Sequence, residues 1–497
     1  MRHVVKRFVS ILILVFVSSV LWASGGMDTV RDQEYDPERL FPCAGLKEDF
    51  AALRFSLEEG HGALYRYSTK QEMDDVFETA ARKINRDMTE REFLRILLPV
   101  VAAVNCGHTS VQKTGFYDWL ENQPVTFPLG FRYISGTPYL VRNYSDREDI
   151  VPGGELVSIN GMPMNQIISD ILPAIPSDAH IETSKFQSIT SSVRFSQLYN
   201  VIYGVTRNYE VKYKHPKTGE ILTVSLKGKN QAEIQERYEQ RYPESAKTFP
   251  VISFREVEGV PVLTIRSFGS MTLKREGFNY SKFLRETFQA LEDRSAEVLI
   301  IDLRENRGGN DAFGKLLFAH LTDKEFLYYA ALEIKNNTFD FFKYTSIPKN
   351  RWTFSEKQAR KNERGWYDVL GHPNLGIQKP IPPVFKGKVY VLINGRSFSA
   401  TGETTSLMHY HKKAVFIGEE CGSGYYGNTS GFMVGVELPQ TGIRMGVPLV
   451  RYTMAVDGYP KDRGIIPDYP CEPGVEDVLA NRDAVLEYAV GLARKNR

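Results

Sequence analysis

The chain has 497 residues, 42% of them hydrophobic and 25% charged, as is typical of a soluble globular protein. This length allows about three domains. The formal net charge is only +2, from 62 Lys and Arg against 60 Asp and Glu, so neither nucleic acid nor an anionic membrane surface is expected as the main partner.

The N-terminus has the pattern of a secretory signal peptide. Arg2 and Arg7 precede the apolar run Phe8–Leu21, and small residues follow it. An uncleaved membrane anchor is the alternative, but the run is shorter than the roughly 20 residues that a spanning helix needs. We therefore expect residues 1–25 to be removed, and the mature chain to be exported to the periplasm or the cell exterior without a membrane span.

Residues 44–115 are expected to form a small N-terminal helical domain. Apolar residues recur there at helical spacing, and Thr89 followed by acidic residues is typical of a helix start. The domain ends in the polar, Gly-punctuated turn 105–109, which contains His108. A lone histidine is usually structural, but the glycine before this one makes it a candidate for function.

Residues 125–228 change to short β-like runs that are joined by Gly, Pro and Asn turns. The segment Gly153–Gly161 predicts a strand closed by an Asn-Gly turn, with a helix over Ile167–Leu172. This pattern resembles a PDZ domain, which binds extended peptides by adding a strand to a sheet edge. Leu129–Phe131 is either a remnant of a carboxylate-binding loop or part of a strand, and 175–205 receives no assignment.

Residues 249–490 have the pattern of an α/β domain. Buried strands are predicted over Val298–Arg304 and Val389–Ile393, and a helix begins at about Ala400. An aromatic and basic insertion, 335–382, interrupts the domain and has the composition of a lid or an interaction surface.

Four cysteines are widely spaced and form no CxxC pair, so no metal site is expected from them. They are Cys43, Cys106, Cys421 and Cys471. Export would permit disulfides, but three pairings are possible and the sequence does not choose among them. Buried free thiols are the alternative.

Ser399 lies at the junction between a predicted buried strand and a predicted helix. The free N–H groups and the dipole of a helix start favour negative charge, which suits a serine nucleophile whose attack creates an oxyanion. The simpler role for this serine is an N-cap.

Gly308 and Gly309 follow the other buried strand. Paired glycines at the carboxyl end of such a strand can bring backbone N–H groups close to a ligand. A phosphate cradle is disfavoured because neither GxxxxGK[ST] nor GxGxxG occurs here. An oxyanion hole fits better, and a structural turn is the alternative.

Three segments together resemble the signatures of the C-terminal-processing (tail-specific) serine peptidases. They are Asp302–Gly309, Ser399–Glu403 and Gly464–Asp468. The resemblance covers roughly residues 45–490. It implies an α/β peptidase core of the ClpP/crotonase-like fold behind the helical and PDZ-like β-rich domains, a peptide or protein substrate, and no cofactor.

The chain departs from the classical branch of this family, which places a lysine 25 positions after the serine, because Gly424 stands there and no lysine follows before Lys461. It is more similar to the branch typified by the tricorn protease core, which uses a histidine from an N-terminal element. Cys106–Thr109 looks like that branch's D/C-G-H-T motif, so the resemblance implies His108 as the general base for Ser399.

That branch also uses an acidic residue just before the final glycine motif. Lys461 stands where the glutamate would align most directly, and Asp462 can take the role only after a shift of one residue. Glu403 is a weaker substitute, more typical of a first-turn helix charge.

The resulting hypothesis is a serine endopeptidase in which backbone N–H groups of Gly308 or Gly309, together with that of Ala400, hold the oxyanion. Two other classes stay open. One is a catalytically inactive peptide-binding protein on the same fold, which the missing lysine favours. The other is a crotonase-like enzyme acting on acyl thioesters, although no adenine- or phosphate-binding motif is evident. The sequence does not indicate the cleavage preference or the oligomeric state.

Overall fold

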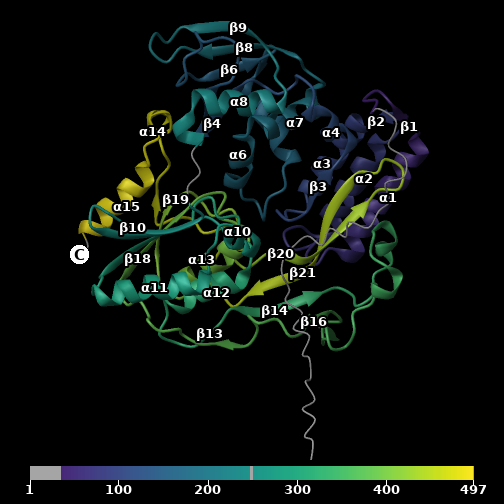
Figure 1. Cartoon of the computed structure of the whole chain (residues 1–497). Coiled ribbons are helices and arrows are strands. Elements are labelled where there is room, and N and C mark those ends of the chain that lie inside the picture. The colour runs from purple at the N-terminus through teal and green to yellow at the C-terminus, as the bar shows by residue number, and fades with distance from the viewer. Residues whose placement is uncertain (1–34, 247–249, 496–497) are drawn as a thin grey trace, which may run out of the picture.

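The computed structural model describes residues 35–246 and 250–495 (Figure 1). The predicted signal peptide, 1–25, lies outside the described residues. In the described part of the chain, no helix has both the length and the apolar character that crossing a bilayer requires. We refer to 35–121 as the N-terminal region, 122–246 as the middle region and 250–495 as the core region.

The N-terminal region is mainly helical. Its elements are β1 (Leu40–Phe41), α1 (Cys43–Gly60), α2 (Lys70–Lys83), β2 (Met88–Thr89), α3 (Glu90–Ala102), β3 (Ser110–Lys113) and α4 (Gly115–Glu121). The helix start predicted at Thr89 is confirmed, because its side chain accepts the N–H of Glu92 and the Glu92 carboxylate accepts the N–H of Thr89. After α3 the chain turns through Asn105, which has a φ of 53°, into the loop that carries His108.

The middle region combines two small sheets with helices. Its elements are β4 (Leu129–Ile134), β5 (Thr137–Asn143), β6 (Leu156–Ile159), β7 (Met162–Pro163), α5 (Met164–Ile171), η1 (Leu172–Ala174), α6 (Thr183–Ile189), α7 (Ser192–Tyr203), β8 (Asn208–Lys214), β9 (Ile221–Lys227), α8 (Gln231–Arg241) and α9 (Pro243–Ala246). The strands β4 and β5 form a hairpin, and the other four form a sheet in the order β7-β6-β8-β9. Leu129–Phe131 is therefore part of a strand.

The segment 175–205, which the sequence left unassigned, contains α6 and α7. Ser191 caps α7 by accepting the N–H of Arg194. Phe195 and Leu198 are fully buried in the main apolar core, so packing stabilises a helix whose Ser-rich sequence hides its periodicity. In Figure 1, α6 extends from the middle region towards the core region.

The core region contains a six-stranded sheet in the order β10-β11-β12-β18-β19-β22. The pair β10–β11 is antiparallel, and the other neighbours are parallel. The strands and helices are β10 (Ile252–Val257), β11 (Val260–Ile265), α10 (Ser270–Arg275), α11 (Tyr280–Asp293), β12 (Val298–Asp302), α12 (Asp311–Ala319), β18 (Lys388–Ile393), α13 (Ala400–Tyr410), β19 (Val415–Gly418), β22 (Tyr469–Pro470), α14 (Val475–Ala480) and α15 (Ala484–Lys495).

Both faces of this sheet are covered by helices. Ile300 and Leu392 pack with residues of α15 on one face, whereas Ile301 and Val391 point into the main apolar core on the other. Figure 1 shows α15 on one side of the sheet and α11 and α12 on the opposite side. Burial on both faces explains why the sequences of β12 and β18 are continuously apolar.

A second sheet joins the core region to the N-terminal region. It has the order β15-β16-β14-β21-β20, and β3 also pairs with β21. Its strands in the core region are β14 (Tyr329–Ile334), β15 (Ala359–Lys361), β16 (Tyr367–Val369), β20 (Thr429–Glu437) and β21 (Arg444–Met454). Because β3 directly follows the His108 loop, its pairing with β21 fixes that loop to the core region (Figure 1).

The aromatic insertion is a packing element. Besides β15 and β16 it contains η2 (Asp340–Tyr344), η3 (Lys349–Arg351) and β17 (Ile377–Gln378), the last paired with β13 (Phe326–Leu327). Phe339, Phe341 and Phe342 are fully buried, and the N–H of Phe341 donates to the Glu59 carboxylate of α1. These rings hold the insertion against α1, and the expectation that the insertion is a lid or an interaction surface stays a prediction.

All four cysteines are free thiols. Cys106 and Cys421 are buried, and Cys43 and Cys471 are partly exposed.

Candidate active site

Ser399 lies on a sharp turn between β18 and α13. Its φ of 59° and ψ of −127° put a non-glycine residue in a conformation that is strained, as in a nucleophile elbow. The Ser399 hydroxyl does not cap α13. The distance from its Oγ to His108 Nε2 is 3.0 Å, which is within hydrogen-bonding reach. The N-cap alternative is therefore excluded by the direction of the side chain.

The glycine loop after β12 packs directly against this turn. The parallel pairing of β12 with β18 brings their carboxyl ends together, and the N–H of Phe398 donates to the carbonyl of Asn306 at 3.0 Å. A Cβ atom on Gly308 would lie 2.7 Å from Ser399 Cβ and 2.9 Å from Ala400 N. Only glycine permits this approach.

The three predicted oxyanion donors differ in how their backbone N–H groups are placed. The N–H of Gly308 donates to the Asn306 side chain at 2.9 Å, so this group is already used within the loop. Gly309 bridges to Phe268 of the neighbouring chain segment. Ala400 opens α13 beside Ser399, where helical N–H groups have no intrahelical partner. Of the three, the N–H of Ala400 is the best placed to bind an oxyanion, and that of Gly308 is the least available for this role.

His108 comes from the opposite side, on the loop between α3 and β3. Its ring stacks on Phe398, with ring centroids 4.6 Å apart. A Cβ atom on Gly107 would lie 2.7 Å from the Phe398 ring, so the glycine before the histidine is required by this close packing. Thr109, the next residue, bonds through its hydroxyl to His61 Nε2 at 2.8 Å.

Burial lowers the pKa of His108 below its ordinary value of 6.5, and the carboxylate of Asp178 partly opposes this effect. The imidazole is consequently neutral near neutral pH and able to accept a proton. Burial also lowers the pKa of His61, to about 3, so His61 is a neutral hydrogen-bonding support for Thr109.

The structure does not bring Asp462 to His108. The Asp462 side chain is exposed, and its backbone carbonyl accepts the N–H of His180. In place of the predicted Asp462, the acidic group near His108 is Asp178. Sequence reasoning missed Asp178, because it lies in the unassigned segment and no motif marks it.

Glu403 also has a different role from the one expected. It is fully buried, and burial beside Asp311 raises its pKa to about 8, so it is protonated at neutral pH. Tyr329 Oη lies 2.7 Å from Oε2 of Glu403 and 2.7 Å from Oδ2 of Asp311. One hydroxyl proton cannot serve two carboxylates, so a proton on Glu403 completes the network. This neutral group cannot act as a first-turn helix charge.

Gly424 stands where the classical branch of the family has its lysine, and the space beside it is filled by the N-terminal region. A Cβ atom on Gly424 would lie 2.4 Å from Tyr67 Oη of the N-terminal region. Lys461 is exposed. The only described side chain that bonds Ser399 Oγ is His108.

The final signature positions the turn 421–425 beside Ser399. Arg463 makes two 2.8 Å bonds to Glu420, and the N–H of Cys421 donates to the carbonyl of Ile465. The turn places Ser423 Oγ 2.7 Å from the N–H of Ser399, which donates to it. The signature therefore supports the nucleophile through the backbone.

One cluster near the site has metal-binding residue types. Ligand atoms of Cys106, His108 and Asp178 lie within 4.8 Å of one another. Burial raises the pKa of Cys106 to about 12, so the thiol keeps its proton, and both carboxylate oxygens of Asp178 already accept hydrogen bonds. Because His108 Nε2 faces Ser399 and both Asp178 oxygens accept bonds from Gly107 and Ser423, the cluster is a hydrogen-bonding network in this structure.

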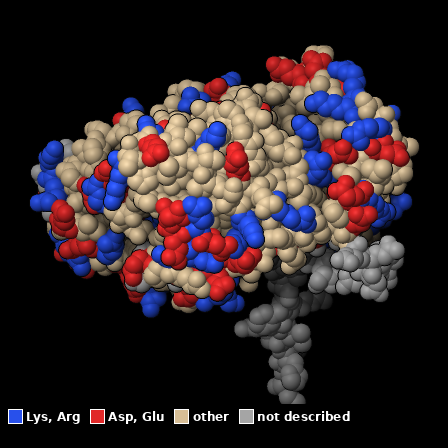
Figure 2. Space-filling model, turned by 90° about the horizontal axis from the view of Figure 1, so that it is seen from above, with Lys and Arg blue, Asp and Glu red and all other residues tan. Residues whose placement is uncertain are grey.

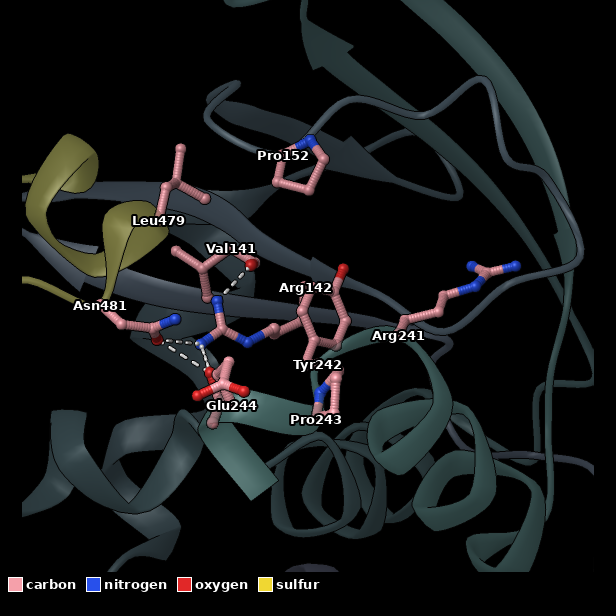
Figure 3. A pocket seen from close by; sticks show the side chains of 10 residues that line it. Val141, Arg142, Pro152, Arg241, Tyr242, Pro243, Glu244, Leu479 and Asn481 are labelled. Carbon is pink, nitrogen blue, oxygen red and sulfur yellow. Dashed lines mark hydrogen bonds between the residues drawn. The ribbon is translucent and has the colours of Figure 1, made fainter. Parts of the chain in front are cut away.

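A pocket of about 310 Å³ lies elsewhere, between the middle region and the end of α14 (Figure 3). The guanidinium of Arg142 donates there to Val141 O, Ser245 Oγ and Asn481 Oδ1. Arg142, Ser245 and Asn481 thus bond to one another. The surface seen from above intersperses positive and negative side chains, as the near-zero net charge suggests (Figure 2).

Comparison with known proteins agrees with this geometry. The sequence model of Peptidase family S41 matches residues 259–471. No curated protein matches the chain in sequence. Among solved structures, a serine-to-alanine mutant of CPAF is 15% identical with a TM-score of 0.60, covering 91% of this chain and 96% of that chain. CPAF complexed with lactacystin is 16% identical with a TM-score of 0.59, covering 91% and 98%.

A serine on a strained strand–helix turn beside an imidazole, in an α/β core, defines a serine peptidase. Residues 259–471 of the core region are thus similar in sequence to Peptidase family S41. The match begins at residue 259 and does not include the N-terminal region that carries His108. Structural likeness at 15–16% identity shows a shared fold.

Proposed function

We propose that this chain is an exported endopeptidase that cleaves peptides, or unfolded and C-terminal segments of proteins, with Ser399 as nucleophile and His108 as general base. The observation that carries the proposal is the 3.0 Å contact between Ser399 Oγ and His108 Nε2, which joins residues 291 positions apart in the sequence. Structural packing alone does not require a hydroxyl on a strained turn to face a neutral imidazole.

The chemistry follows from the two atoms in contact. His108 Nε2 takes the proton of Ser399 Oγ as Oγ attacks the peptide carbonyl, and the resulting oxyanion is held by N–H groups that include that of Ala400. Nε2 then gives the proton to the leaving amine, and the C–N bond breaks. A water molecule hydrolyses the acyl-enzyme by the same proton transfers in reverse.

The proposed substrate class is supported by the position of the site. Ser399 and His108 are partly exposed at the junction of the N-terminal, middle and core regions. An extended segment can enter such a junction more easily than a folded domain. The middle region, with its PDZ-like sequence pattern, would bind the same segment by strand addition at a sheet edge.

The test is hydrolysis of an unstructured protein, such as reduced and alkylated casein, by wild type, Ser399→Ala and His108→Ala. Both variants are expected to lose activity, and a fluorophosphonate should label wild type but not Ser399→Ala. Unchanged activity in His108→Ala would overturn the assignment of the base. Peptide affinity without turnover or labelling in wild type would instead support the inactive binding protein.

A further inference from the structure

The inner nitrogen of His108 has no hydrogen-bond partner among the described residues. Nε2 faces Ser399, whereas Nδ1 is buried and unpaired. During the proposed reaction His108 becomes an imidazolium, and the proton on Nδ1 then needs an acceptor or a negative charge nearby. A buried unpaired nitrogen is also costly in the resting protein.

Asp178 lies close to the ring of His108. Its carboxylate is fully buried, and one of its oxygens is within 4.8 Å of a ring nitrogen of His108. Oδ1 accepts the N–H of Gly107 at 2.8 Å, which fixes the backbone just before the histidine. Hydrogen bonds of a catalytic base are often long without substrate and shorten in the complex.

The same carboxylate also supports the nucleophile. Oδ2 accepts the hydroxyl of Ser423 at 3.3 Å and the N–H of Gly424 at 3.4 Å. Ser423 Oγ in turn accepts the N–H of Ser399 at 2.7 Å. Two hydrogen bonds thus connect Asp178 to the backbone of the nucleophile, and one connects it to the backbone beside the base.

Three buried neighbours of the site, His61, Cys106 and Tyr67, carry no charge at neutral pH. Burial lowers the pKa of His61 to about 3 and raises those of Cys106 and Tyr67 to about 12. Glu403 is protonated in its own network, and Asp462 is exposed. Of the described groups, Asp178 is the one whose charge acts on His108.

Asp178 is delivered by the loop between η1 and α6. The N–H of Ala179 donates to the carbonyl of Asn105, and Thr183 Oγ1 donates to the carbonyl of Glu420. Farther along α6, Gln187 donates to the Glu419 carboxylate at 3.0 Å. The loop therefore contacts the base side and the nucleophile side at once.

We propose that Asp178 is the positioning residue of this active site, in the role for which the sequence suggested Asp462. It orients His108, stabilises the imidazolium and fixes the Ser399 turn, so docking of the middle region completes the site. This inference rests on the proposed function, in which Ser399 and His108 form the reacting pair.

The experiment compares Asp178→Asn with Asp462→Asn and with Asp49→Asn in the full chain. Asp49 is a matched control because its buried carboxylate also accepts two backbone N–H groups and one hydroxyl, but from Gln440 and Thr441. Asp178→Asn should lower kcat by about 10²–10⁴-fold, by analogy with loss of a triad aspartate. Asp462→Asn and Asp49→Asn should stay within about threefold of wild-type kcat per folded molecule.

The pH dependence of kcat/KM distinguishes a positioning role of Asp178 from a role in stability alone. Because the Asp178 charge raises the pKa of His108, the acid limb of kcat/KM should move to lower pH in Asp178→Asn and stay in place in Asp49→Asn. A wild-type kcat in Asp178→Asn, or a large loss in Asp462→Asn, would overturn the inference. Full activity of His108→Ala would instead overturn the proposed function itself.

A measurement on wild type covers the case in which Asp178→Asn does not fold. With histidine-selective ¹⁵N labelling and His108→Gln for assignment, NMR should show the neutral ring protonated on Nδ1, with Nε2 unprotonated towards Ser399. A proton on Nε2 in the free enzyme would contradict the positioning role.

Discussion

Ser399 and His108 meet at 3.0 Å, but they are held by different kinds of structure. Ser399 is placed by one continuous segment, β18 followed by a strained turn and α13, against a glycine loop of the neighbouring strand. His108 is placed by contacts among separate regions: its ring stacks on Phe398, Asp178 accepts the N–H of Gly107 beside it, and β3 pairs with β21. The nucleophile is thus a local feature of the backbone, whereas the base depends on docking.

The largest effect is expected from variants that test whether Ser399 and His108 react together as a pair. Ser399→Ala and His108→Ala should each lower kcat/KM by about 10⁴–10⁶-fold, and the double variant should lose no more than the worse single variant, since a missing nucleophile leaves the base without a role. Steady-state kinetics with active-site titration measures this. Multiplicative losses would show that the two side chains act independently.

A smaller effect on the rate is expected when a larger side chain displaces the loop that carries His108. In Gly107→Ala the new Cβ must displace Phe398 or His108, and a shift of about 1 Å in a catalytic group can cost about 10²-fold in rate. Gly491→Ala in α15 is the control, because its Cβ would meet nothing within 4 Å. It should keep full activity and gain up to about 1 kcal/mol of stability. Equal activity of the two variants would show that the base loop tolerates displacement.

The pH dependence of activity reports the environment of the base. The neutral form of His108 is the active one, and burial lowers its pKa, so kcat/KM should fall only as the pH drops through a value below 6.5. The measurement is kcat/KM on a peptide substrate from pH 4 to 8, with stability checked at each pH. A half-maximal pH above 7 would contradict a buried neutral base.

The smallest effect is expected on the free energy of unfolding and concerns Glu403, in the helix that follows Ser399. Glu403 has a folded-state pKa of about 8 against an ordinary 4.5, so the free energy of unfolding should decrease by about 1 kcal/mol per pH unit as the pH rises between these values. In Glu403→Gln this contribution should disappear, since Gln can donate to Tyr329 and accept from Asn428. Urea unfolding at pH 5 to 8 measures the difference.

Glu437→Gln is the control for that comparison, because Glu437 is an exposed partner of Arg444 on β20. It should show the same pH dependence as wild type. If Glu403→Gln also ran parallel to wild type, the Glu403 carboxyl would be ionised in the fold, which would contradict its raised pKa.

Several elements were predictable because their signals are local. Continuous apolar runs predicted β12 and β18, and the capping residues predicted the start of α3. The helices α6 and α7 were not predictable, since their stability comes from burial of residues such as Phe195. The packing of Phe341 against α1 was also not predictable, because composition does not show whether an aromatic ring faces solvent or a helix.

The sequence by itself determined the nucleophile turn, the glycine loop and the candidacy of His108, because a strained turn and a close backbone approach leave fixed residue types at short spacing. Only the tertiary structure decided that Gly308 bonds within its own loop, that Tyr67 fills the space beside Gly424, and that Asp178 lies by the base. These contacts join segments tens to hundreds of residues apart, and burial and charge act on them only after the regions have packed together.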